Sequence, residues 1–137
     1  MIWKDCIRLG KVEKRTQDKE LAKSLLNIAT ERFNFFRNKE GSVFVLEGVY
    51  EAIIELCHAI LALNGYKTLS HECAIEFLRE RYLNSYEVEF LHKLRKKRHN
   101  IKYYGKIFSK EIIERNVKIA SKIFLKLKTL LKEELRL

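Results

Sequence analysis

Cationic side chains gather in one short stretch of the chain, and these residues have the strongest potential for chemistry. Residues 92–102, HKLRKKRHNIK, contain six Lys and Arg residues, two histidines and no acidic residue. Lysine and arginine bind phosphate groups, and histidine can transfer protons near neutral pH. Two interpretations are open: the cations converge on an anion, or they form a solvated face whose charge is favourable near a helix C-terminus.

Arg98 is the best single candidate for a site residue within this stretch. On a helix, Arg98 falls in the middle of the inward face that is formed by Val88, Leu91, Leu94 and Ile101. A guanidinium on an apolar face must be paired or must border a wet cleft, because burial of an isolated charge is very costly. We therefore expect Arg98 to be partly buried, beside a carboxylate or a water-filled cleft.

A polar strip elsewhere in the chain supplies candidate partners for this arginine. Residues 43–64 are otherwise apolar, but spacings of four, four and three place four polar side chains on one helical face: Glu47, Glu51, Glu55 and His58. Glu51 and Glu55 are the candidate charge partners of Arg95 or Arg98, across the chain or across a dimer. In the alternative interpretation the strip faces solvent.

Helices are the elements expected to position these residues. Apolar residues recur at spacings of three and four over 17–38 and 43–64, a shorter helix is expected from Ser70 to Asn84, and another from there to about residue 104. Asn84 and Glu87 match a capping box, and Gly65 and Gly105 fit helix ends. A last helix after Ser109 has a predicted buried stripe of Ile112, Ile113, Val117, Ala120, Phe124, Leu127, Leu131 and Leu135.

The predicted fold is all-α: an up-and-down four-helix bundle with an additional short helix, in a single domain that spans residues 1–137. No run of alternating polarity predicts a sheet. The segment 43–64 is apolar almost all round, as expected of a helix that is surrounded by others or half-buried in a partner subunit. Part of its surface is therefore expected in a two-fold homodimer interface.

Charge and cysteine content limit the classes of function. The 137 residues carry a formal net charge of +10, which favours acidic partners such as nucleic acid and is also compatible with a lysine-rich solvated surface. Cys6, Cys57 and Cys73 form no Cys-x-x-Cys motif, so we expect free thiols in a reducing, cytoplasmic setting. The most apolar stretch, 43–63, contains three glutamates and a histidine, and no membrane span is expected.

Motifs for several other chemistries are absent from the sequence. It has no Gly-rich phosphate loop, no G-x-S-x-G and no H-E-x-x-H. The Cys57-His58 pair and the His71-Glu72-Cys73 segment do not have the spacing of a closed zinc site. We expect neither a metal nor another cofactor.

Three segments and their order carry a family resemblance. They are KELAKSLLNIATERFNFF, AILALNGYKTLSHECAIEFL and EVEFLHKLRKKRHNIKYYG, with the Gly65-Tyr66-Lys67 turn, the Ser70-His71 helix start and the Arg98-His99 step as the most specific pieces. Together they resemble the HEPN domain (higher eukaryote and prokaryote nucleotide-binding) over nearly the whole chain. The resemblance implies a four-helix core with a short accessory helix, a two-fold dimer, and an active cleft where two motif helices meet.

Many HEPN proteins look like metal-independent ribonucleases, often toxins paired with a small nucleotidyltransferase. Their motif is arginine, a polar residue, three variable residues and histidine; the histidine serves as acid or base while the arginine steadies the phosphorane charge. Arg98 and His99 match the first two positions, but Tyr103 stands where the final histidine belongs. Tyrosine, with an unperturbed pKa of about 10, is a poor general base at pH 7. The adjacent His99 points about 100° away from Arg98 around the helix.

Three interpretations of function are open, and we favour the first. It is a HEPN-type protein that binds RNA or a nucleotide, as partner of a minimal nucleotidyltransferase in a toxin–antitoxin-like pair, through Arg95, Lys96, Lys97, Arg98, Lys102 and Tyr104. The second is an active metal-independent endoribonuclease with Arg98, His99 and Tyr103 as catalytic residues. The third is a structural helical dimer with no ligand.

Overall fold

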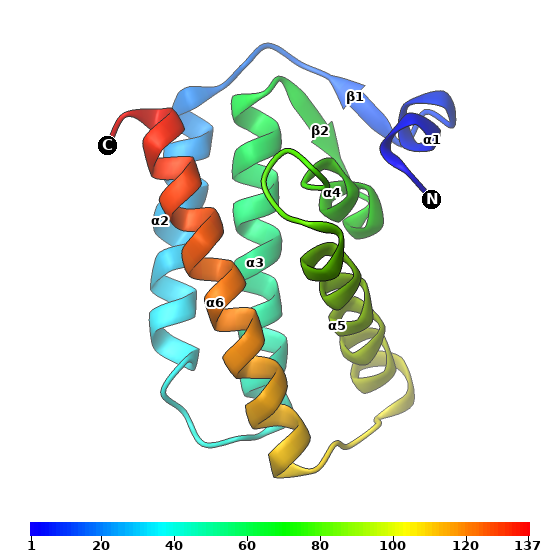
Figure 1. Ribbon diagram of the computed structural model, residues 1–137, viewed down its shortest axis with the longest axis vertical. Helices are drawn as coiled ribbons and strands as arrows, with labels where there is room; N and C mark the ends of the chain where they lie inside the picture. The colour runs from blue at the N-terminus through cyan, green and yellow to red at the C-terminus, as the bar shows by residue number, and fades with distance from the viewer.

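The computed structural model describes residues 1–137 and is mostly helical (Figure 1). The helices are α1 (Trp3–Arg8), α2 (Lys19–Phe36), α3 (Val43–Leu63), α4 (His71–Phe77), α5 (Ser85–Tyr104) and α6 (Lys110–Leu135). The strands β1 (Val12–Lys14) and β2 (Tyr66–Thr68) form one antiparallel pair. None of the helices combines the length and the apolar character that crossing a bilayer requires.

The four long helices lie side by side, and helices that follow one another among them run in opposite directions (Figure 1). α3 packs against α2, α4, α5 and α6. α1 and the two-stranded sheet lie at one end of the molecule, next to α4. The β1–β2 pairing places Glu13 opposite Lys67 and joins the N-terminal segment to the turn that follows α3.

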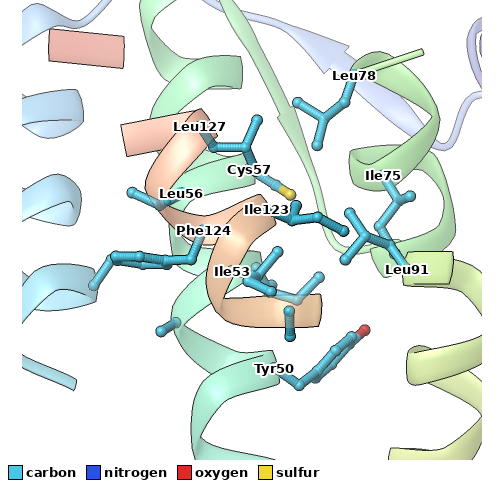
Figure 2. Packing of buried hydrophobic residues seen from close by; sticks show 14 of the residues in the cluster. Tyr50, Ile53, Leu56, Cys57, Ile75, Leu78, Leu91, Ile123, Phe124 and Leu127 are labelled. Atoms are coloured by element: carbon cyan, nitrogen blue, oxygen red, sulfur yellow. The ribbon is translucent and has the colours of Figure 1, made fainter. Parts of the chain in front are cut away.

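The core is built around α3, which buries 14 of its 21 residues. Figure 2 shows its Ile53, Leu56 and Cys57 packed among side chains of the other helices, including Phe124 of α6 and Leu91 of α5. The other helices of the same chain therefore cover the apolar surface of α3. Because this apolar surface is covered within the chain, it is not evidence for a partner subunit. The homodimer stays a prediction.

One glycine allows α2 and α3 to approach closely. A Cβ atom at Gly48 would lie only 2.3 Å from the ring of Phe36. Any side chain at this position would push the two helices apart or force Phe36 out of its place. One turn earlier on α2, the ring of Phe33 stacks on Phe124 of α6, with 4.0 Å between the ring centroids.

Helix starts agree with the sequence because side chains cap them. Asp18, Ser70, Asn84 and Ser109 each accept a hydrogen bond from the backbone N–H three residues later. The Asn84 backbone N–H in turn donates to the Glu87 carboxylate, which completes the predicted capping box. Gly65 and Gly105 have φ angles of +81° and +61° and follow helix ends, also as predicted.

Some predicted elements differ from the structure. α4 ends at Phe77 instead of near Asn84, because residues 78–83 form a turn in which Glu80 has a φ of +68°. α1 and the sheet were not predicted; strands of three residues are too short to show alternation. On α6, Ile112 was expected in the core but is exposed, whereas Ile123, absent from the predicted stripe, is buried.

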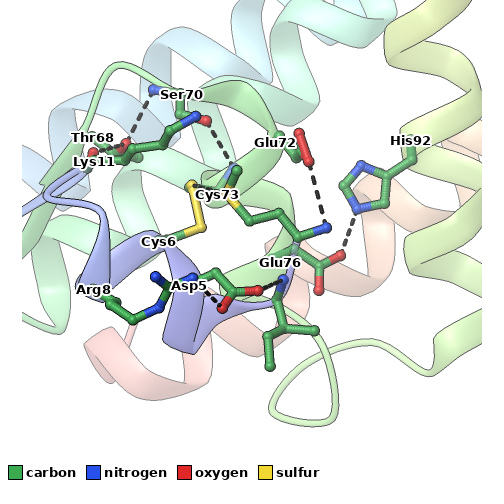
Figure 3. Close-up of a disulfide and its surroundings, with 12 residues drawn as sticks. Asp5, Cys6, Arg8, Lys11, Thr68, Ser70, Glu72, Cys73, Glu76 and His92 are labelled. Carbon is green, nitrogen blue, oxygen red and sulfur yellow. Dashed lines mark hydrogen bonds and ion pairs between the residues drawn. A yellow bond between two sulfur atoms is a disulfide. The ribbon is translucent and has the colours of Figure 1, made fainter.

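A disulfide joins Cys6 of α1 to Cys73 of α4 (Figure 3). Cys57 is free and buried in the core. The prediction of free thiols was therefore wrong for two of the three cysteines. The two partners are 67 positions apart in the sequence, and tertiary contacts such as the β1–β2 pairing and the packing of Trp3 on Phe77 bring them together. No local spacing could have indicated this pair.

The disulfide predicts the number of reactive thiols. Alkylation of the unfolded, unreduced protein is expected to modify Cys57 alone, and alkylation after reduction is expected to modify all three cysteines. Because the bond closes a long loop, reduction should lower the free energy of unfolding by about 2–4 kcal/mol, measured by urea denaturation with and without reductant. The Cys6→Ser/Cys73→Ser variant should match the reduced protein. Three reactive thiols in the unreduced protein would contradict the pairing.

Candidate functional site

The lysines of α5 carry charge that no acidic residue neutralises. The helix has four lysines, and all are exposed or partly exposed: Lys93, Lys96, Lys97 and Lys102. The lysines that form ion pairs within the chain are Lys23, Lys110 and Lys126, none of which belongs to α5. The C-terminal half of α5 therefore presents unpaired positive charge to solvent.

Exposed aromatic rings lie among these lysines at the end of α5. The side chains of Tyr103 and Tyr104 are 61% and 76% exposed. The His99 ring is 4.6 Å from the Tyr103 ring and 5.9 Å from the Tyr104 ring, between centroids. The Lys102 ammonium lies 5.5 Å from the centre of the Tyr103 ring. Cations beside exposed rings are the combination with which proteins hold single-stranded nucleic acid.

Arg98 points toward a different part of the molecule. It is partly buried, as predicted, but forms no ion pair within the chain, so no carboxylate lies within 4.0 Å of it. Its charge acts on Tyr50 of α3 and on His71 of α4. Burial lowers the pKa of His71, and the positive charge of Arg98 lowers it further, whereas Glu51 acts in the opposite direction.

Of the three predicted catalytic residues, His99 and Tyr103 have neighbouring rings, and Arg98 differs from them in being partly buried. His99 and Tyr103 lie together on the exposed side of α5. Arg98 is directed toward α3 and α4, where its charge acts on Tyr50 and His71. An arginine and a proton-transfer group at a common phosphate would require a second chain or a different histidine.

The acidic strip of α3 meets α2, not the arginines of α5. Glu55 accepts two hydrogen bonds from Arg32 of α2, at 2.8 and 3.2 Å. Within the chain, the predicted pairing of Glu55 with Arg95 or Arg98 is therefore wrong, because α2 packs against this part of α3 and Arg32 binds the Glu55 carboxylate. The pairing across a dimer stays a prediction. Glu51 forms no ion pair, although its charge acts on the pKa of both His58 and His71.

Arg95 has an incomplete set of partners. Its guanidinium lies 3.9 Å from a Glu72 carboxylate oxygen of α4, a long distance for an ion pair. Its Nε atom is buried and has no hydrogen-bond partner. Arg95 and Arg98 thus lie on the α4 side of α5, with charge that the chain itself only weakly compensates.

Tyr50 of α3 and His71 of α4 are in contact, and this contact was not predicted from the sequence. The Tyr50 hydroxyl and Nδ1 of His71 are 2.9 Å apart. Tyr50 is fully buried, and burial raises the pKa of its hydroxyl, so this group keeps its proton. A single tyrosine in an apolar helix has the pattern of a core residue, and nothing in its spacing relates it to a histidine 21 positions later.

A buried carboxylate fixes α5 against α4, and the sequence did not indicate it either. Glu76, 4% exposed, accepts two hydrogen bonds from Arg79 at 2.9 Å and lies 2.5 Å from Nε2 of His92 (Figure 3 shows the His92 contact). Arg79 also binds Glu89 of α5 at 2.6 Å. Burial acts to raise the pKa of Glu76, but the bonds from Arg79 and His92 outweigh it and lower that pKa.

Comparisons with known proteins identify no relative. The chain matches no protein-family model and has no significant similarity to a curated protein or to a solved structure. Inferences about its function therefore depend on its own residues and on the family resemblance described above.

The Glu76 contacts predict a pH-dependent contribution to stability. Because the pKa of Glu76 is lower in the folded than in the unfolded state, its ionised form stabilises the fold above the unfolded pKa, and this is lost as the pH falls through the folded pKa. Glu76→Gln should lower the free energy of unfolding by roughly 3 kcal/mol at pH 7 and by much less in acid, measured by urea denaturation. Glu89→Gln, at the exposed partner of Arg79, is the control and should have a small effect. Equal effects of the two variants at pH 7 would contradict the assignment.

Proposed function

We propose that the chain is a HEPN-type domain that binds RNA or a nucleotide through the C-terminal half of α5. The contacting residues are Arg95, Lys96, Lys97, Arg98, Lys102 and Tyr104. The proposal is carried by one observation: unpaired lysines and exposed tyrosine rings occupy the same end of one helix. Phosphates bind the lysines and arginines, and unstacked bases of single-stranded RNA stack on aromatic rings.

The finer features of the family belong to this proposal. α2, α3, α5 and α6 would be its four-helix core, with α4 as the accessory helix. Two copies would form a homodimer that brings the motif helices together, in the cytoplasm, with a minimal nucleotidyltransferase as partner. The accessible end of α5 supports such a pairing, because no element of the same chain covers Tyr103 or Tyr104.

Salt dependence tests the RNA contact directly. If α5 contacts phosphates, the affinity for single-stranded RNA should fall steeply with salt, with a log–log slope of about −0.7 for each contact. Fluorescence anisotropy with a labelled oligonucleotide measures it. Lys96→Glu/Lys97→Glu should weaken binding and flatten the slope, and Arg98→Ala should weaken it more than Lys97→Ala. A matched reversal on α6, Lys118→Glu/Lys122→Glu, should have less effect. Absence of RNA binding at low salt would favour the structural dimer with no ligand.

The ribonuclease alternative has one observation in its favour, the contact between the His99 and Tyr103 rings. In this alternative the tyrosine has replaced the histidine of the family motif. Because Arg98 of the same chain is partly buried whereas His99 and Tyr103 are exposed, a second copy would supply the arginine in this alternative.

Replacing the tyrosine tests this alternative. Tyr103→His introduces an imidazole with an ordinary pKa of about 6.5, so cleavage of mixed cellular RNA in EDTA should increase around neutral pH. Gel electrophoresis of the RNA measures it, and light scattering establishes whether the protein is dimeric. Addition of Arg98→Ala should abolish any cleavage gained. A folded, dimeric, RNA-binding variant that cuts nothing would show that more than one residue has been lost.

A further inference from the structure

A cavity of about 680 Å³ lies between the start of α2, the C-terminal half of α3, β2 and the start of α4. Two histidines line it, His58 from α3 and His71 from α4. Its apolar wall includes Leu21, Leu25 and Ala62, and cationic groups come from Arg15 and Lys67. The volume is within the range of small-molecule sites, which combine an apolar wall with a few convergent polar groups.

The histidine nitrogens that have no partner are open to this cavity. The ring centroids of His58 and His71 are 6.4 Å apart. The buried side-chain nitrogen and oxygen atoms that lack a hydrogen-bond partner are His92 Nδ1 and Arg95 Nε. Both ring nitrogens of His58, and Nε2 of His71, also lack a hydrogen-bond partner within the chain. They are not among the buried atoms without a partner. They are therefore solvent-accessible, and the cavity that these rings line is where a ligand would meet them.

Tyr50 prepares His71 to act as a hydrogen-bond donor. Its buried hydroxyl keeps its proton and lies 2.9 Å from Nδ1 of His71. With the hydroxyl as donor, the proton of the neutral imidazole lies on Nε2. Since Tyr50 is held in the core of α3, the contact also fixes the orientation of the His71 ring.

The charged surroundings of the two histidines favour an anion. Acting on them from α3 and α5 are Glu51, Arg95, Arg98 and Lys102, and the cavity wall adds Arg15, Asp18 and Lys67. The Asp18 carboxylate is occupied in capping α2, and Arg15 pairs with Glu13. Lys67 forms no ion pair within the chain. The groups that remain available to a ligand are thus a lysine and two imidazoles.

We propose that this cavity binds a nucleoside monophosphate unit, with His58, His71 and Lys67 around the phosphate and Leu21 and Leu25 against the base. The unit is either a free nucleotide or the terminal nucleotide of an RNA. The choice of nucleotide rests on the proposed function, but the site is separate from the lysines of α5. The charges of Arg98 and Lys102 of α5 act on His71 of the cavity, so one RNA strand that reaches both sites is part of the proposal.

Binding at this site takes up a proton. Burial lowers the pKa of both histidines, so they are largely neutral near pH 7 in the empty cavity. A phosphate dianion beside them favours the imidazolium form and raises these pKa values. His58 can take up the proton directly, whereas protonation of His71 requires the Tyr50 hydroxyl to turn and accept from Nδ1. Affinity for a phosphate ligand should therefore increase as the pH falls from 8 to 6, by up to about tenfold per pH unit for one linked proton.

Calorimetry with adenosine 5′-monophosphate on the full chain tests the proposal. Titrations in two buffers of different ionisation enthalpy give the number of protons taken up, and histidine NMR spectra identify the rings that respond. Adenosine and inorganic phosphate as separate probes show which part of the ligand is recognised, and a 5′-phosphorylated RNA compared with its 5′-hydroxyl form tests the terminal nucleotide. We expect the monophosphate to bind with proton uptake and the phosphorylated RNA to bind more tightly than its hydroxyl form.

Variants make the assignment specific. His58→Gln/His71→Gln should weaken monophosphate binding about tenfold or more and abolish the proton uptake. Lys118→Gln, at an exposed lysine of α6 outside the cavity, should leave both unchanged. Lys67→Glu, at an exposed position, should also weaken binding and serves if the double variant does not fold.

The outcomes separate this proposal from the proposed function. Binding that is absent at millimolar ligand, independent of pH, or unchanged in both cavity variants would overturn the cavity site, whereas salt-dependent RNA binding through α5 would survive that result. Monophosphate binding in the cavity without RNA binding would support the cavity site and overturn the proposed function of α5.

Discussion

Burial of α3 is the constraint on which the rest of the structure depends. Its apolar surface extends almost all round the helix, and α2, α4, α5 and α6 are placed by packing against it. Gly48 sets how closely α2 can approach, because a Cβ there would overlap the Phe36 ring and cost about 1–3 kcal/mol. The seven residues of α3 that are not buried include the polar strip from Glu47 to His58. The charged side chains of α3 and its histidine are therefore confined to one face of the helix that forms the core.

That open face is divided among different neighbours along its length. Arg32 of α2 neutralises Glu55, and α4 places His71 against Tyr50. α5 is held by Glu76 and His92, so its arginines approach the same region from the other side. Because Glu55 is already paired, the charge of Arg95 and Arg98 is not cancelled by the strip. The positive charge stays available at the boundary between α4 and α5.

The long helices and their caps could be predicted from the sequence because both depend on local patterns. Apolar spacing located α2 and α3 to within about two residues, and Asn84 with Glu87 fixed the start of α5. Predictions were wrong where distant segments meet. The Cys6–Cys73 bond, the Arg32–Glu55 pair and the Tyr50–His71 contact each join residues whose proximity follows from tertiary packing. The partial burial of Arg98 was predictable from its angle on the helix, but the identity of what it faces was not.

The candidate catalytic residues of α5 are close in the sequence but lie on different sides of the helix. Read along the chain, Arg98, His99 and Tyr103 form one candidate group, but successive helical residues point about 100° apart. On the exposed side, His99 and the tyrosines offer rings among unpaired lysines, which suits binding of a flexible strand. On the inner side, Arg98 acts on a histidine that belongs to another helix and is oriented by a buried tyrosine. A proton-transfer group beside Arg98 is thus present in the fold even though the motif position holds tyrosine, and it comes from α4.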